Sequence, residues 1–337
     1  SEETDEACNF TIPDYTSLTT ASDNCSATIT VTQSPIAGTV ISGNGTIQEI
    51  VLIANDGNGN TAAISFNVTL LDNVVPTLTA VPDQEEETDA TCNFTIPDYT
   101  SLTTAADNCA TAITVTQSPI AGTVISGNAT IQEIVLTADD GNGNTAATFF
   151  NVTLSDNIVP TLTAVADQSE ETDEACNFII PDYTALTTAS DNCSATIIVT
   201  QSPIAGTVIA GNGTIQEIVL TANDGNGNTA AISFNVTLLD NVMPTLTTVA
   251  DRQEATDATC SFMIPDYTLL TTASDNCGTP ILTQLPVAGT LITGHGTDQE
   301  IVLTADDGNG NTASTSFNIL LQGINVFYAD NDGDGYG

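Results

Sequence analysis

The feature that most constrains the fold of this chain is a short motif, Asp-Gly-Asn-Gly-Asn, which occurs four times. The copies occupy residues 56–60, 140–144, 224–228 and 307–311, so successive copies are 84, 84 and 83 residues apart. A period of this length exceeds a single supersecondary unit, and with strand-like content it indicates tandem domains. The sequence therefore predicts four copies of one domain in series.

Each motif lies between two runs of alternating apolar and polar residues, for example 50–54 and 61–70. Gly and Asn adopt positive φ at low cost, and the tight turns that match strand twist require it. Each motif is therefore predicted to be a β-hairpin turn. No stretch shows a helical period, and Thr, Val and Ile dominate the apolar runs. About seven short strands in ~84 residues predict an all-β fold: immunoglobulin-like antiparallel β-sandwiches in a linear tandem array.

The period places domain boundaries near 72/73, 156/157, 240/241 and 323/324. The resulting repeats are 1–72, 73–156, 157–240 and 241–323, followed by an Asp-rich segment at 324–337. The first repeat lacks a counterpart of the Pro-Thr-Leu-Thr-Ala-Val segment at 76–81, and the last residues stop inside a motif. We therefore expect the chain to be a fragment of a longer protein.

A comparison of two repeats checks which side chains the predicted strands point inward. Residues 1–72 and 169–240 differ at only five positions. Three of these differences exchange Thr and Ile at positions that the register points outward: Thr11/Ile179, Thr30/Ile198 and Ile53/Thr221. A hydroxyl in place of a methyl group inside a packed core would be a buried, unpaired polar group. The outward placement therefore supports the register.

Charge excludes several classes of partner. The formal net charge is −41, from 42 acidic residues against one basic residue, Arg252. Such a surface repels nucleic acid and anionic lipid, which bind through Lys and Arg, and it attracts divalent cations. No run approaches the ~20 apolar residues of a membrane-spanning helix. We therefore predict no nucleic-acid partner and no membrane insertion of this segment.

The sequence also argues against an enzyme. His295 is the only histidine, and it stands in a Gly-His-Gly turn where other repeats have Asn44 or Asn128. A Ser-His-Asp triad would therefore exist in one repeat of four. The absence of lysine excludes Schiff-base chemistry. We predict that the chain is not an enzyme.

Cysteines follow the same period, two per repeat and 17 residues apart. They are Cys8, Cys25, Cys92, Cys109, Cys176, Cys193, Cys260 and Cys277. The constant separation predicts four local disulfides, one within each repeat, and hence an oxidising, extracellular compartment. Zinc is the alternative, but pairs of cysteines need further ligands nearby.

Two groups of aspartates are candidate calcium ligands. Asp330, Asp332 and Asp334 stand at relative positions 1, 3 and 5 with Gly at position 6, as at the start of a calcium loop. The alternative for them is a flexible acidic tail. The second group lies at hairpin turns and repeat junctions, where calcium between modules would stiffen the joint: Asp56, Asp72, Asp140, Asp156, Asp224 and Asp240. For this group we favour the alternative that Asp-Asn and Asp-Gly simply form turns.

The motif order carries a family resemblance. Asp-Asn-Cys is followed by Gly-Thr-Val-Ile at 38–41, then by Ile-Val-Leu-x-Ala-x-Asp-Gly-Asn-Gly-Asn-Thr-Ala and Ser-Phe-Asn-Val-Thr-Leu. This order resembles the hyalin repeat, an immunoglobulin-like extracellular module associated with adhesion in surface arrays of Bacteroidota. The lysine-free, Thr-rich copies look most like giant gliding-motility adhesins, which implies type IX secretion and an outer-membrane-associated location. The Asp-rich end resembles a thrombospondin type 3 repeat, which implies calcium.

The expected function is mechanical. We predict a segment of a long extracellular stalk or filament that mediates attachment to a surface or glycan ligand of unknown identity, with self-association into filaments as a further partner. Repulsion between acidic modules extends the array, and repeated surfaces give multivalent adhesion. Two alternatives remain: a directly glycan- or ice-binding module, although only 5% of residues are aromatic, and a non-catalytic appendage of a larger secreted enzyme.

Overall fold

The computed structural model describes residues 1–110 and 112–323. The predicted calcium ligands Asp330, Asp332 and Asp334 lie outside the described residues. The chain divides into two compact units, Ser1–Ile158 and Val159–Gly337, and each unit is described by itself. No helix in the described part has the length and apolar character that crossing a membrane requires.

Each unit contains two modules, which we name after the predicted repeats. Module 1 is residues 1–72 and module 2 is 73–156, while module 3 is 157–240 and module 4 is 241–323. These boundaries stay predictions. The elements of unit 1 are β1 (Glu2–Glu3), β2 (Asn9–Thr11), η1 (Thr16–Leu18), β3 (Thr30–Ser34), β4 (Val40–Ser42), β5 (Ile47–Asn55), β6 (Thr61–Leu71), β7 (Thr77–Leu78), β8 (Gln84–Glu87), β9 (Asn93–Thr95), η2 (Thr100–Leu102), β10 (Ala105–Ala106), β11 (Thr114–Ser118), β12 (Val124–Ser126), β13 (Ile131–Asp139) and β14 (Thr145–Ser155).

Unit 2 repeats this order of elements. They are β15 (Thr161–Leu162), β16 (Gln168–Glu171), β17 (Asn177–Ile179), η3 (Thr184–Leu186), β18 (Ala189–Ser190), β19 (Ile198–Ser202), β20 (Val208–Ala210), β21 (Ile215–Asn223), β22 (Thr229–Leu239), β23 (Thr245–Leu246), β24 (Arg252–Ala255), β25 (Ser261–Met263), η4 (Thr268–Leu270), β26 (Ala273–Ser274), β27 (Ile281–Leu285), β28 (Leu291–Thr293), β29 (Asp298–Asp306) and β30 (Thr312–Gln322).

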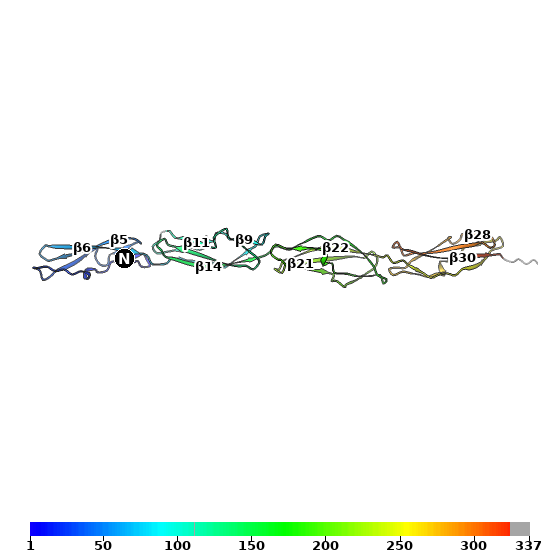
Figure 1. The fold of residues 1–337 in the computed structure, drawn as a ribbon, viewed down its shortest axis with the longest axis horizontal. Helices are drawn as coiled ribbons and strands as arrows, with labels where there is room; N and C mark the ends of the chain where they lie inside the picture. Colours follow the sequence, from blue (N-terminus) through cyan, green and yellow to red (C-terminus); the bar gives the residue numbers. More distant parts are fainter. Residues whose placement is uncertain (111, 324–337) are drawn as a thin grey trace, which may run out of the picture. The chain divides into compact units, whose positions relative to one another are not determined.

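The fold is all-β, as predicted, and consists of repeated sandwich-like sheets. In module 1 one sheet has the order β1-β6-β5-β3 and the other pairs β2 with β4. The long strands β5 and β6 run side by side (Figure 1) and flank the predicted turn, with Asn55 opposite Thr61. Gly57 and Gly59 take φ of +83° and +103° there, as a tight turn requires. The sheet is not purely antiparallel, because β1 pairs with β6 in parallel.

A separate hydrophobic core fills each module. In module 1 it comprises Ile12, Tyr15, Ile50, Leu52, Val68 and Leu70. The alternation of β5 explains this, because every second side chain points to the same face of the sheet. The three Thr/Ile exchanges lie outside the cores, as predicted: Ile179 and Ile198 are exposed and Ile53 is half-buried.

Module 2 contains a short strand pair that module 1 does not show among the described residues. In module 2, β7 pairs antiparallel with β10, and unit 2 contains the corresponding pairs β15 with β18 and β23 with β26. Module 1 has neither strand among the described residues. The sequence accounts for this difference, since the counterpart of the segment that forms β7 would precede Ser1.

Candidate metal centre

Asp140 holds the Asp-Gly-Asn-Gly-Asn turn of module 2 together. Its Oδ1 accepts hydrogen bonds from the backbone N–H groups of Asn142 (2.8 Å) and Asn144 (3.0 Å), and its Oδ2 accepts one from Asn144 Nδ2 (2.6 Å). Burial raises the pKa of Asp140, but these hydrogen bonds to the charged form outweigh burial and bring the pKa below its ordinary value. Asp140 is therefore ionised at neutral pH although only 4% of it is exposed.

Asp72 comes from module 1, directly after β6, and is also only 4% exposed. Its N–H donates to Asn44 Oδ1 (3.0 Å), which fixes the residue at the end of the strand. The turn of module 2 then contacts it twice: Asn142 Nδ2 donates to Asp72 Oδ2 (2.9 Å), and Asn144 Nδ2 donates to the Asp72 carbonyl (3.1 Å). The asparagines of the turn therefore bind the preceding module.

Asp107 is the third acid and lies in the Asp-Asn-Cys loop that follows β10. Its Oδ1 accepts hydrogen bonds from the N–H groups of Cys109 (2.8 Å) and Ala110 (2.7 Å). Its Oδ2 is buried and has no hydrogen-bond partner among the described residues, and the same holds for Asn108 Oδ1. Buried polar oxygens are normally paired, so these two oxygens are candidate ligands for a cation.

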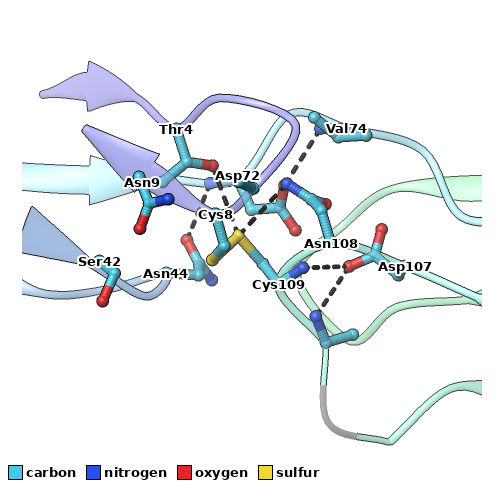
Figure 2. Close-up of a disulfide and its surroundings, with 12 residues drawn as sticks. Thr4, Cys8, Asn9, Ser42, Asn44, Asp72, Val74, Asp107, Asn108 and Cys109 are labelled. Carbon is cyan, nitrogen blue, oxygen red and sulfur yellow. Dashed lines mark hydrogen bonds between the residues drawn. A yellow bond between two sulfur atoms is a disulfide. The ribbon is translucent and has the colours of Figure 1, made fainter. Parts of the chain in front are cut away.

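These three carboxylates converge at one joint. One oxygen from each of Asp72, Asp107 and Asp140 lies within 4.8 Å of the others. Figure 2 shows Asp72, Asp107 and Asn108 grouped beside the disulfide of this joint. At an effective dielectric constant of ~20, two unit charges ~4.8 Å apart repel by about 3 kcal/mol. Asp72 and Asp140 are buried and Asp107 is half-buried, so a cation at this joint would offset the repulsion between them.

The chain itself supplies no counter-charge at this joint. Its one Lys or Arg residue is Arg252, in unit 2, where Nε pairs with Glu254 Oε1 at 3.1 Å. A counter-ion at this joint would therefore come from solution.

The donor set fits calcium. Calcium takes oxygen ligands at about 2.3–2.6 Å, carboxylate oxygens among them. Three carboxylate oxygens that lie within 4.8 Å of one another can all reach one such ion. Asp72, Asp107 and Asp140 would hold the ion, and Asn108 Oδ1 would add a neutral oxygen.

Unit 2 repeats this geometry between modules 3 and 4. Asp240, Asp275 and Asp307 bring one oxygen each within 4.8 Å of the others. Asn309 Nδ2 donates to Asp240 Oδ2 and Asn311 Nδ2 to the Asp240 carbonyl, both at 2.9 Å. The unpartnered buried oxygens are again those of the Asp-Asn-Cys loop. Two separately described joints therefore share one arrangement.

The predicted pairing of the cysteines is wrong. Cys8 bonds to Cys109 of the next module, and Cys176 bonds to Cys277, each across 101 residues rather than 17. In the described chain Cys25 and Cys260 are free and exposed, whereas Cys92 and Cys193 are disulfide-bonded. The disulfides therefore join modules instead of closing loops within them.

The reason is that the two cysteines of a module lie at opposite ends of its long strands. Gly43, just before β5, donates its N–H to the Cys8 carbonyl (3.1 Å). Beside Cys25, Ser26 Oγ donates to the carbonyl of Asp56 (2.8 Å), just after β5 ends. Nine strand residues at ~3.3 Å per residue separate these ends by ~30 Å, which a disulfide cannot span.

Asp56, another predicted aspartate, has different surroundings. Asp56 holds its own turn through Asn58 N–H (2.8 Å) and Asn60 Nδ2 (2.8 Å), and no acid group of the described chain includes it. Its pKa is lowered chiefly by the Asn60 side chain. Asp224 holds its turn in the same way through Asn226 N–H (2.8 Å), and the Asp156 N–H donates to Asn128 Oδ1 (2.9 Å).

Sequence reasoning missed Asp107 and Asp275. The signal was present, because each repeat places an Asp two residues before its second cysteine. We assigned that Asp to a loop and did not connect it with the turn of the same module. The predicted turn role of His295 agrees with its place between Gly294 and Gly296, where Nδ1 accepts from Gly323 N–H (2.8 Å) as Asn44 accepts from Asp72.

Comparison with known proteins gives a likeness at the level of fold. No family model and no curated protein matches the chain. Solved structures with tandem cadherin domains do match. Protocadherin gamma B2 extracellular domains 1–5 are 13% identical, with 90% of this chain and 73% of that chain covered and a TM-score of 0.38.

Two further matches are of the same kind. For mouse cadherin-23 EC22–24 the identity is 14%, the coverage 75% and 99%, and the TM-score 0.34. For Drosophila N-cadherin EC1–4 the identity is 12%, the coverage 95% and 98%, and the TM-score 0.29. These likenesses concern tandem all-β extracellular domains.

Proposed function

We propose that this chain is a structural repeat segment of an extracellular adhesion-type protein whose neighbouring modules are fixed by a disulfide and a calcium ion. The observation that carries the proposal is the joint of unit 1, where three carboxylates from two modules converge next to the Cys8–Cys109 bond. Each link holds residues of both modules, so together they limit bending and rotation. A stiff joint gives the mechanical reach that a stalk needs.

The charge of the chain supports the same function. With a net charge of −41 the modules repel one another, and calcium at the joints offsets that repulsion where the modules meet. Disulfides form and persist in oxidising compartments, which supports an extracellular location. Proteins of the same fold with tandem extracellular cadherin domains are a precedent for the architecture.

The resemblance to hyalin repeats supplies the finer part of the proposal. The biological setting would be a gliding-type adhesin on the surface of a member of the Bacteroidota, anchored at the outer membrane after type IX secretion. Motif order and composition support this setting, and the Asp-rich end would add calcium through Asp330, Asp332 and Asp334. Immunolabelling of intact cells tests it: surface label supports the setting, and label confined to the cell interior overturns it.

The calcium site is tested with a matched pair of variants. Asp107→Asn keeps an oxygen that can accept the Cys109 and Ala110 N–H groups but removes a charge from the joint. Asp23→Asn makes the same change in module 1, where Asp23 Oδ1 accepts from Cys25 (2.7 Å) and Ser26 (2.6 Å) and belongs to no acid group of the described chain. We expect Asp107→Asn to lose one equivalent of bound calcium in isothermal titration and Asp23→Asn to lose none.

Thermal unfolding gives a second measurement on the same proteins. Calcium at 100 times its Kd stabilises a site by about 2.7 kcal/mol, so calcium should raise the Tm of the parent protein and the chelator EGTA should lower it. In Asp107→Asn the transition of module 2 should respond less. Equal calcium binding by the parent and Asp107→Asn, or an equal loss in both variants, would show that the acids are not ligands.

A further inference from the structure

Asn44, Asp72 and Asn142 form a closed ring of hydrogen bonds at the joint of unit 1. The Asp72 N–H donates to Asn44 Oδ1 (3.0 Å), Asn44 Nδ2 donates to Asn142 Oδ1 (2.8 Å), and Asn142 Nδ2 donates back to Asp72 Oδ2 (2.9 Å). Figure 2 shows Asn44 beside Asp72 at this joint. Asn44 and Asp72 belong to module 1 and Asn142 belongs to module 2, so the ring crosses from one module to the next.

Unit 2 contains the same ring between modules 3 and 4. The Asp240 N–H donates to Asn212 Oδ1 (2.9 Å), Asn212 Nδ2 donates to Asn309 Oδ1 (2.7 Å), and Asn309 Nδ2 donates to Asp240 Oδ2 (2.9 Å). Each of these residues occupies the same place in its module as its counterpart in unit 1. The ring is therefore a property that the two separately described joints share.

The hydrogen bonds of the ring can run in only one direction. A backbone N–H can only donate, so the Asp72 N–H holds Oδ1 of Asn44 and leaves Nδ2 of Asn44 to face module 2. Asn142 must then present its Oδ1 to Asn44, and its Nδ2 faces the Asp72 carboxylate, which can only accept. Turning either amide over would place two donors or two acceptors together. Both amides therefore have a single orientation, which the backbone at the end of β6 determines.

Module 4 shows that accepting this backbone N–H does not in itself require an asparagine. His295 stands at the position of Asn44, and its Nδ1 accepts from the Gly323 N–H (2.8 Å). An imidazole ring carries a carbon where asparagine carries Nδ2, whereas an amide offers an acceptor and a donor side by side. The contact with the turn of the following module therefore explains why positions 44 and 212 hold asparagine.

We propose that Asn44 and Asn212 are specificity-determining residues of the joints. Each selects a following module with Asn at the third position of its Asp-Gly-Asn-Gly-Asn turn and holds that module in one orientation without a cation. One hydrogen bond shifts an equilibrium by about two- to fivefold, so three bonds favour this orientation by roughly ten- to a hundredfold. A calcium ion would then bind to a joint whose orientation is already set.

The test uses the 337-residue protein in EGTA with its disulfides kept. Residual dipolar couplings of the backbone N–H groups measure how each module is aligned in solution. In the parent protein, modules 1 and 2 should share one alignment, because a ring that needs no cation holds them together. Separate alignments of modules 1 and 2 in the parent protein would overturn the proposal.

A matched pair of variants tests the ring itself. Asn44→Asp keeps the size of the side chain and the acceptor for the Asp72 N–H, but it replaces the donor Nδ2 by an oxygen. Module 2 should then lose the alignment that it shares with module 1. Asn73→Asp is the control, because Asn73 is exposed, donates to Glu3 Oε1 of its own module (2.6 Å) and lies next to Asp72 in the chain. The control adds the same charge and should keep the shared alignment.

Two results with this pair would contradict the proposal. A shared alignment in Asn44→Asp would show that the disulfide alone orients the modules. An equal loss in Asn44→Asp and Asn73→Asp would show that the added charge is the cause. Asn212→Asp and its control Asn241→Asp repeat the comparison in unit 2, where Asn241 is exposed and donates to Glu171 Oε1 (2.5 Å).

Two further variants separate the ring from the calcium site and from a change at one residue alone. Asp107→Asn removes a candidate calcium ligand but no member of the ring, so modules 1 and 2 should still share one alignment in EGTA. Loss of that alignment would assign the orientation to the Asp107 loop and refute the ring. Asn142→Leu opens the ring from the other module, so Asn44→Asp/Asn142→Leu should lose no more alignment than either single variant. A larger loss in the double variant would show that the two asparagines act independently.

Discussion

Modules 1 and 2 have almost the same sequence pattern but meet different surroundings at the same positions. Asp140 and Asp56 hold identical turns, yet Asp140 faces a second module and is 4% exposed, while Asp56 is half-buried. Cys109 is bonded across the joint, and its equivalent Cys25 is free. The difference teaches that, in the described chain, the three-acid group and the disulfide are completed where one module meets the next.

The loop around the first cysteine of a module has the same backbone conformation whether or not that cysteine is bonded. Free Cys260 has φ of +54°, and bonded Cys8 has +58°, in the left-handed region that is strained for a non-glycine residue. In both cases the loop is held by hydrogen bonds of the backbone: the cysteine N–H donates to Asp257 or Asp5, and a glycine donates to its carbonyl. The module backbone therefore preorganises the cysteine for a bond to a neighbour.

The largest expected effect comes from removing the Cys8–Cys109 disulfide, because the equivalent of Cys109 in module 1, Cys25, is free. A disulfide that closes a ~100-residue loop is worth about 4.7 kcal/mol in the chain-entropy model. The double variant Cys8→Ser/Cys109→Ser should therefore lose roughly 4 kcal/mol from the free energy of unfolding of module 2 in urea. Cys25→Ser, the control at the free equivalent, should be unchanged within the error of the measurement. A similar loss of unfolding free energy in the double variant and in Cys25→Ser would show that the Cys8–Cys109 disulfide is not what stabilises module 2.

This comparison also shows what the sequence could predict and what it could not. Alternation along 50–54 and the Gly-rich turn at 56–60 determine the hairpin locally, so strands, turn and inward residues follow from pattern alone. The pairing of Cys8 depends on which end of the sandwich it occupies, and a separation of 17 residues does not carry that information. The same holds for Asp107, whose partners Asp72 and Asp140 belong to other elements of the two modules.

Only part of the acid group at this joint could be proposed from the sequence, for the same reason. Asp72 and Asp140 could be proposed because they stand at a junction and at a turn tip, two places where modules in series come close. Asp56 was included by analogy with Asp140, but it occupies the corresponding turn of a module whose turn meets no other acid group in the described chain. Contact between modules, not the motif itself, brings the three acids together.

A smaller effect distinguishes two equivalent alanines. Ala138 of module 2 is fully buried, so Ala138→Leu overpacks that core and should cost about 1–3 kcal/mol. Ala54 of module 1 is only half-buried and lines a pocket of about 310 Å³, so Ala54→Leu should cost less than about 0.5 kcal/mol. Urea unfolding of the two variants measures the difference, and equal costs would show that burial of the alanine does not decide the cost.

The smallest effect concerns the tyrosine that packs under each β-sheet. Tyr99 lies edge-on against Phe150, with ring centroids 5.3 Å apart, and its hydroxyl donates to Glu86 Oε1 (3.4 Å). Burial and the nearby charge of Glu86 raise the pKa of Tyr99 to about 12. In module 1 burial and Glu2 also raise the pKa of Tyr15, but its hydroxyl has no hydrogen-bond partner among the described residues.

The sign of the pH dependence follows from these shifts. A tyrosine in the unfolded chain ionises near pH 10, and folded Tyr99 resists ionisation until about pH 12. The stabilisation is therefore complete below pH 10 and is lost as the pH rises from 10 to 12. Tyr99→Phe cannot ionise, so its stability should fall less over this interval, and its absorbance titration near 295 nm should lack one late step. Tyr15→Phe should remove a step at lower pH, because the Tyr15 hydroxyl lacks the hydrogen bond that Tyr99 donates to Glu86. If both variants lose a step at the same pH, the two tyrosines do not differ in this way.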